Sequence, residues 1–139
     1  MDKGTLIEIL GIPVPLQRHR SFRSYGKIIQ YDPQIKEKLE FVKKIRQILI
    51  DPVQIEKLLQ KISYEVTIVF CMPYPKSKLR KVMPLLCDIP HICKPDIDNL
   101  IKYVLDCGNG LLWSDDKKII KITCKKVYAE EPKTVILID

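Results

Sequence analysis

Two aspartates, Asp96 and Asp98, stand two positions apart at the start of a segment whose apolar spacing predicts a helix. If the backbone before that helix is extended, both carboxylates point the same way. Carboxylate oxygens are ligands that Mg²⁺ prefers, and the ion keeps several waters, so a few carboxylates and a substrate phosphate can hold it. The pair therefore indicates a divalent-cation site, with a helix cap and a solvated charge as the alternative.

Further candidates follow along the same helix and in the turn after it. Lys102 lies one turn beyond Asp98 on the same face, and Asp106 lies one turn further. A lysine beside a metal can neutralise the charge that grows on phosphorus and the leaving oxygen during phosphodiester hydrolysis, while the metal activates water. One of Asp115 and Asp116 is expected to fold back and complete the site. For Asp106, a surface ion pair with Lys102 is an equal alternative.

The formal net charge of +7 is concentrated in three clusters of basic residues. They comprise Arg18, Arg20, Arg23 and Lys27; Lys76, Lys78, Arg80 and Lys81; and Lys117, Lys118, Lys121, Lys125 and Lys126. Phe22 and Tyr25 are interspersed in the first cluster, which contains no acid. Basic clusters contact the phosphates of nucleic acid and give it salt-dependent affinity. The first two clusters are the expected DNA-binding residues, with a merely solubilising surface as the alternative.

Length and composition favour one soluble domain spanning residues 1–139. Hydrophobic residues make up 46% and charged residues 29%, and no apolar run approaches the roughly 18 residues that span a bilayer. The start of the chain does not resemble a secretory signal, so we expect a cytoplasmic protein. The five cysteines form no CxxC pair, and the spacing of Cys87, His91 and Cys93 fits no usual zinc site. Reduced thiols are therefore expected.

Apolar patterning in the N-terminal part predicts a strand over residues 5–10, ended by Gly11, and a loop or hairpin over residues 18–27. A helix follows, with Asp32 as its N-cap and Pro33 at its first position. The apolar face of this helix is formed at three- and four-residue steps by Ile35, Leu39, Val42, Ile45 and Leu49. This face is expected to pack on a sheet.

The rest of the chain alternates between helical and strand patterns. The expected elements are a short helix over residues 53–62, a strand over 64–71, a long loop over 72–93, a helix ended by Gly108 to Gly110, and strands over 119–128 and 134–138. Together they predict an α/β fold of the α+β type, in which one small domain holds a mixed β-sheet packed by two or three helices.

The acidic motif and its surroundings resemble the signature of RusA-type Holliday junction resolvases. The matching C-terminal residues are the run from Lys94 to Lys102, then Asp106, Trp113-Ser114-Asp115-Asp116 and Ile119. The matching N-terminal residues are Gly11, Pro13, Pro15, Arg18-His19-Arg20, Gly26, Tyr31 and Pro33. The resemblance covers nearly the whole chain. It departs from the family pattern at His19, where proline is frequent, and in the longer loop over 72–93.

The resemblance implies a RusA-like homodimer that binds four-way DNA junctions and resolves them by paired symmetric nicks in DNA recombination and repair. The enzyme would be an endodeoxyribonuclease that uses Mg²⁺, with Mn²⁺ as a substitute, and that associates with the nucleoid when bound to DNA. Asp96, Asp98 and Asp116 would be the essential metal-binding carboxylates and Lys102 the essential lysine. Asp115 would be a possible additional acid.

Two other classes of function fit part of the pattern. A different Asp-x-Asp phosphoesterase, or a glycosyltransferase, that acts on small molecules would use the acids but would not need three basic clusters. A phosphatase with an aspartyl intermediate would also carry its acids after a hydrophobic strand, whereas His91 to Pro95 precedes them here. A non-catalytic nucleic-acid-binding module would explain the charge, with the acids serving only to cap and orient a helix.

Overall fold

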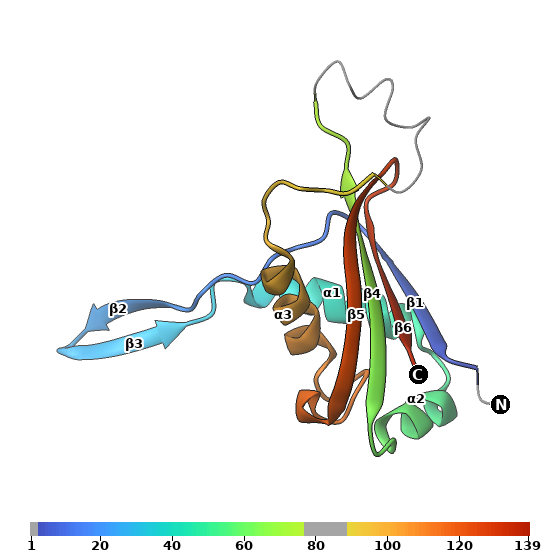
Figure 1. The fold of residues 1–139 in the computed structure, drawn as a ribbon. Helices are drawn as coiled ribbons and strands as arrows, with labels where there is room; N and C mark the ends of the chain where they lie inside the picture. The colour runs from blue at the N-terminus through green and yellow to red at the C-terminus, as the bar shows by residue number, and fades with distance from the viewer. Residues whose placement is uncertain (1–2, 77–88) are drawn as a thin grey trace.

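The computed structural model describes residues 3–76 and 89–139, so Lys78, Arg80, Lys81 and Cys87 lie outside the described residues. Its elements are β1 (Thr5–Leu10), β2 (Arg20–Ser24), β3 (Lys27–Tyr31), α1 (Ile35–Ile48), α2 (Pro52–Leu59), β4 (Tyr64–Pro73), α3 (Ile97–Gly108), the short 3-10 helix η3 (Asp116–Lys118), β5 (Ile119–Ala129) and β6 (Lys133–Ile138) (Figure 1). None of the described helices is long and apolar enough to cross a membrane.

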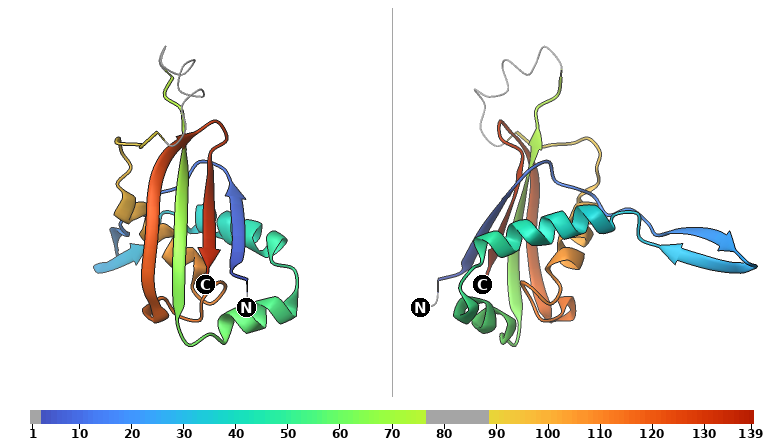
Figure 2. Two further views of the ribbon diagram at one scale, coloured as in Figure 1. Left: turned by 45° about the vertical axis from the view of Figure 1, so that its right-hand side comes forward. Right: turned by 180° about the vertical axis from the view of Figure 1, so that it is seen from behind.

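Four strands form one mixed sheet in the order β1-β6-β4-β5. The pairs β1–β6 and β4–β6 are antiparallel, whereas β4 and β5 run parallel. All four strands were expected from their alternating or continuous apolar residues, with ends shifted by two residues at most. With the helices packed against it, this sheet confirms the predicted α+β fold class (Figure 2).

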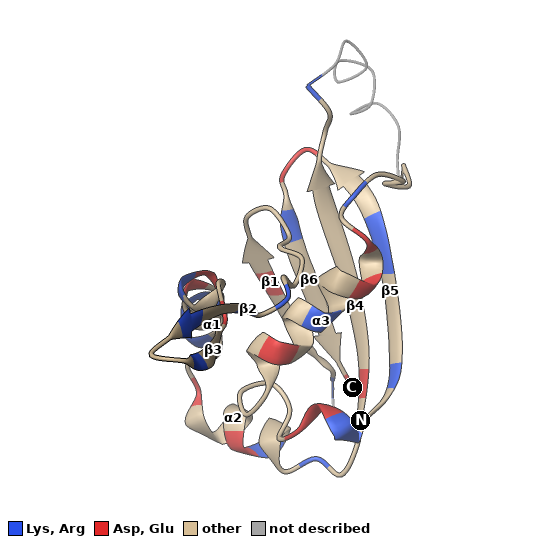
Figure 3. Cartoon of the chain, turned by 90° about the vertical axis from the view of Figure 1, so that its left-hand side faces the viewer, with Lys and Arg blue, Asp and Glu red and all other residues tan. Residues whose placement is uncertain are grey.

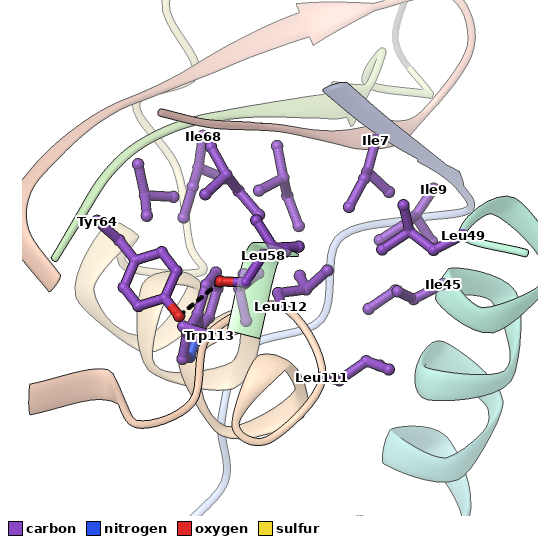
Figure 4. Packing of buried hydrophobic residues seen from close by; sticks show 14 of the residues in the cluster. Ile7, Ile9, Ile45, Leu49, Leu58, Tyr64, Ile68, Leu111, Leu112 and Trp113 are labelled. Carbon is purple, nitrogen blue, oxygen red and sulfur yellow. Dashed lines mark hydrogen bonds between the residues drawn. The ribbon is translucent and has the colours of Figure 1, made fainter. Parts of the chain in front are cut away.

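The hydrophobic core lies between one face of the sheet and the helices (Figure 4). Alternate residues of β4, such as Ile68 and Phe70, are buried there, as the two-residue period of a strand requires. Tyr64 joins three elements, because its hydroxyl donates to the Leu58 carbonyl at 2.8 Å and accepts from the main-chain N–H of Ser114 at 3.2 Å. The turn after α3 is thereby fixed to the core.

The start of α1 differs from the expectation. The helix begins at Ile35 with Gln34 at the N-cap position, so Asp32 and Pro33 lie in a turn before it. The carboxylate of Asp32 accepts a hydrogen bond of 2.8 Å from the main-chain N–H of Gln34, as an Asp in a turn commonly does. The expected capping side chain was therefore placed two residues too early.

The apolar face of α1 is also only partly covered. Ile45 is fully buried, whereas Ile35 is 55% exposed and Leu39 is 64% exposed. The N-terminal half of the helix runs beyond the edge of the sheet toward the β2–β3 hairpin (Figure 2). The periodicity correctly predicted an amphipathic helix, but the expectation that its whole apolar face packs on the sheet was wrong.

Two helix ends are set by specific residues. Asp51, which was expected only to separate two helices, caps α2, since its carboxylate accepts from the main-chain N–H of Val53 at 3.0 Å. At the end of α3, a Cβ atom on Gly108 would lie 2.4 Å from the Trp113 ring, so only glycine fits there. The left-handed residue of this turn is Gly110, with φ of 74°.

Candidate active site

Asp96 and Asp98 lie at the N-terminal end of α3, where both side chains are exposed. Asp96 is the N-cap residue with extended backbone, and Asp98 already belongs to the first helical turn. The sequence suggested that one extended segment carries both aspartates, but only Asp96 has extended backbone. The side chain of Asp96 makes no capping hydrogen bond to the helix. Its carboxylate oxygens are therefore not used by the cap, although the positive end of the helix favours negative charge there.

Lys102 stands one turn along α3 from Asp98, as expected from their spacing. Its Nζ lies 3.7 Å from Asp98 Oδ2, and the two side chains are 59% and 64% exposed. An exposed pair of this kind adds at most a few tenths of a kcal/mol to stability. The amine can therefore turn toward a bound phosphate at little cost in folding free energy.

Asp116 lies at the other end of α3. Its main-chain N–H donates a hydrogen bond of 2.9 Å to the side-chain oxygen of Asn109, the C-cap residue of that helix. The helix has 12 residues, which corresponds to a length of about 18 Å. Within one chain the turn that holds Asp116 does not fold back to Asp96 (Figure 1). Among residues 3–76 and 89–139, no three His, Cys, Asp or Glu side chains are grouped closely enough to hold a metal.

Two other acids have structural contacts. Asp115 caps η3 by accepting from the main-chain N–H of Lys117 at 3.0 Å, and this hydrogen bond holds the pKa of Asp115 below its usual range. Asp106 forms an ion pair of 3.5 Å with Lys38 of α1. An ion pair between Asp106 and Lys102 was one alternative from the sequence, but Lys102 pairs with Asp98 instead. The Asp106 pair helps join α1 to α3.

The segment before the hairpin is attached directly to the start of α3. The main-chain N–H of Leu16 donates to the carbonyl of Asn99 at 2.9 Å. Gln34, only 1% exposed, accepts from the main-chain N–H of Gln17 at 2.7 Å and donates to the carbonyl of Pro15 at 2.9 Å. A shallow depression beside Asp96 is lined by Pro15, Leu16, Lys94, Pro95, Asp96 and Asn99. The base of the basic hairpin therefore adjoins the acidic pair.

On its other side, the acidic segment is attached to β5 through Lys126. The Nζ of Lys126 donates to the carbonyl oxygens of Cys93 and Pro95, both at 2.6 Å. Its main-chain carbonyl accepts from the N–H of His91 at 3.0 Å. Lys126 was assigned by sequence to a basic cluster, but its amine is directed at the backbone. Neither Lys126 nor Gln34 was identified as part of the site from sequence.

The basic residues of the first cluster lie on or next to the β2–β3 hairpin, whose sequence contains no acid (Figure 3). Arg18, Arg20, Arg23 and Lys27 are all exposed. In the second cluster Lys76 is exposed, and the other three residues lie outside the described part of the chain. In the third cluster Lys117 lies 3.5 Å from Asp115. The exposed basic hairpin is joined to the candidate site through its base, where Leu16 bonds to Asn99.

Comparison with known proteins relates this chain to a nuclease family and to a bacterial protein. A family described as Endodeoxyribonuclease RusA matches residues 11–139 of this chain. An uncharacterized protein, YqaN of Bacillus subtilis (strain 168), is 28% identical over 133 residues, which cover 94% of this chain and 92% of that protein. The family match includes the acidic pair, Lys102, the tandem acids and the basic hairpin.

Proposed function

This chain belongs to the RusA family of endodeoxyribonucleases, whose members resolve Holliday junctions, and we propose that it does so by Mg²⁺-dependent, paired symmetric nicks. The activity would serve DNA recombination and repair, in the cytoplasm and on the nucleoid. The observation that carries the catalytic part is the Asp96 side chain. It occupies the N-cap position but makes no capping hydrogen bond to the helix. A purely structural role as a helix cap would require that bond.

The chemistry of the acidic pair suits a hard divalent cation. Asp96 and Asp98 offer exposed carboxylate oxygens at the positive end of α3, and oxygen ligands are those preferred by Mg²⁺ and by Mn²⁺ as a substitute. When bound, the metal would activate water for attack on a phosphodiester. Lys102, beside Asp98, would stabilise the negative charge that develops on the phosphate oxygens.

We assign Asp116 to the same centre through a second subunit. Asp116 lies in η3, beside the C-terminal end of α3, and is too far from Asp96 within one chain. A homodimer in which Asp116 of one subunit approaches Asp96 and Asp98 of the other would unite the three carboxylates. Two such centres related by a twofold axis could cut matching strands of a junction. Asp115, which already caps η3, is then a neighbour of the site and not a ligand.

DNA would be held by the hairpin and the second basic cluster. The β2–β3 hairpin and the residues before it carry the exposed side chains of Arg18, Arg20, Arg23 and Lys27. Their position suits contact with the phosphates of the DNA being cut. We assign Lys76, Lys78, Arg80 and Lys81 the same role, on their charge and sequence position.

The test is cleavage of three labelled substrates, a synthetic four-way junction, a flap and an uninterrupted duplex, each with Mg²⁺ and with EDTA. We expect paired nicks in the junction with Mg²⁺ and none with EDTA. Cleavage of the duplex at the same rate as the junction would contradict junction resolution but not nuclease chemistry. Binding without cleavage in Mg²⁺ or Mn²⁺ would contradict the enzymatic proposal.

A further inference from the structure

The β2–β3 hairpin projects away from the body of the molecule (Figures 1 and 2). Within the described part of the chain, its two strands pair only with each other and do not join the four-stranded sheet. All five residues of β3 are exposed, and so are four of the five in β2. An isolated two-stranded ribbon buries little apolar surface and is marginal in water by itself. Apolar side chains on it are therefore not explained by packing against the body of the molecule among residues 3–76 and 89–139.

The pairing register places three of these apolar side chains on one face, whereas Ile28, opposite Arg23, lies on the other. Phe22 is opposite Ile29, and Tyr31 is two positions further along the same face, opposite Arg20. The rings of Phe22 and Tyr31 meet edge to face with centroids 5.8 Å apart. Phe22 is 50% exposed, and Ile29 and Tyr31 are each 42% exposed. Arg20 lies at the base of this face and Lys27 near its tip. The face is an apolar, aromatic patch with a cation at each end.

The tip of the hairpin has a second unusual feature. The two loop residues, Tyr25 and Gly26, have φ of 49° and 75°, the conformation of a type I′ turn, which favours Asn-Gly. Tyr25 adopts this left-handed conformation less readily than Asn, and its side chain is completely exposed. The tyrosine therefore contributes nothing to packing within the described chain, and a ring is available at the point furthest along the hairpin.

We propose that the face formed by Phe22, Ile29 and Tyr31, together with Tyr25, contacts DNA bases whose stacking is interrupted at a branch point. Aromatic side chains stack on exposed bases of any sequence, and the adjacent cations would hold the flanking phosphates. The inference rests on the proposed function in taking branched DNA as the substrate. It adds that the hairpin recognises unstacked bases as well as the charge of the phosphates.

The charge of the hairpin favours DNA over a second copy of this chain as the occupant. No acidic residue occurs between residues 9 and 31, whereas Arg18, Arg20, Arg23 and Lys27 all do. Pairing two such hairpins across a twofold axis would bring like charges together. A polyanion, in contrast, complements the cations that border the apolar patch.

The experiment measures DNA binding in EDTA, so that cleavage does not enter. Labelled four-way junction and uninterrupted duplex of the same sequence are titrated over a series of salt concentrations with the full chain. The test variant combines Phe22→Val and Tyr25→Asn, which keep the charge and suit a strand and a type I′ turn. The matched control, Arg23→Gln, removes one charge from the same hairpin and keeps every ring.

We expect the aromatic variant to lose at least about fivefold in junction affinity, with duplex affinity and salt dependence unchanged. Arg23→Gln should weaken both complexes and reduce the slope of log affinity against log salt by about 0.9. Unchanged junction affinity, an equal loss on duplex, or dissociation of a wild-type dimer by the aromatic variant would overturn the inference. Absence of DNA binding by the unaltered chain would overturn the proposed function as well. Absence of cleavage alone would leave the base contact standing.

Discussion

The side-chain amine of Lys126 donates a hydrogen bond of 2.6 Å to the main-chain carbonyl of Pro95, the residue before Asp96. A second bond of 2.6 Å reaches the carbonyl of Cys93. One side chain from β5 thereby fixes the irregular segment that leads into α3. Because the carboxylate of Asp96 has no capping bond of its own, its position depends on this segment.

Lys126→Met should impair cleavage through the position of the acidic pair. Hydrogen bonds from a charged donor contribute about 1.5–3 kcal/mol, so we expect a loss of about tenfold in junction cleavage at limiting Mg²⁺. Activity should recover partly at high Mg²⁺, while junction affinity in EDTA changes little. The control is Lys121→Met, the same change on the same strand. An equal loss in the control, or a loss independent of Mg²⁺, would contradict the positioning role.

Gln34→Met should destabilise the fold. The variant keeps the length of the side chain but leaves the main-chain N–H of Gln17 and the carbonyl of Pro15 without the partner that Gln34 now provides. Both hydrogen bonds are part-buried, and losing each should cost about 0.5–1.5 kcal/mol, which urea denaturation would detect. Gln60→Met is the matched control, because Gln60 makes an exposed bond to Glu56. Equal stability of the two variants would refute the assigned role of Gln34.

Asp32 predicts a pH-dependent contribution to stability. Hydrogen bonds from the Lys38 amine and the Gln34 main-chain N–H lower the pKa of Asp32 below its ordinary value of 3.8. A carboxylate with a lowered folded-state pKa stabilises the fold above its unfolded pKa, and this stabilisation is lost as pH falls through the folded value. Wild type should therefore be about 1 kcal/mol more stable than Asp32→Asn at pH 7. Denaturation at successively lower pH should show this difference in stability shrinking as the pH falls below the ordinary pKa of 3.8. A difference that stays constant with pH would contradict the assignment.

Mixing two inactive variants tests the composite metal centre. In a homodimer that shares its sites, Asp98→Asn and Asp116→Asn chains together form one centre with all three carboxylates intact. Mixing them under conditions of subunit exchange should restore cleavage of single strands, although each variant alone is inactive. If all three carboxylates act within one subunit, the mixture should stay inactive. Nicking assays on the separate and mixed proteins distinguish the two arrangements.

The sequence predicted the elements that depend on local periodicity. β1 and β4 follow from alternating or continuous apolar residues, and α3 from the apolar stripe after Asp98. For α1 the same periodicity indicated an apolar face but not where the sheet beneath it ends, so the exposure of Ile35 and Leu39 was missed. The position of a helix over a sheet is a tertiary property that a local pattern does not contain.

The site was predicted only in part for the same reason. The spacing of Asp98 and Lys102 correctly placed them one turn apart. Gln34 and Lys126 were missed because these partners are 17 to 33 positions away in the sequence. The distance between Asp96 and Asp116 depends on α3 keeping its full length between them. The residues of a turn after a helix do not show in which direction the chain continues.

On the proposed function, the acidic pair at the start of α3 is the centre that cleaves DNA. The most direct test is the rate at which wild type and Asp98→Asn nick a labelled four-way junction in Mg²⁺, with binding measured in EDTA. We predict a loss of at least about a hundredfold in cleavage with binding retained, because the substitution changes the exposed carboxylate and not the basic hairpin. Cleavage by Asp98→Asn at the wild-type rate would contradict the assignment of the active site.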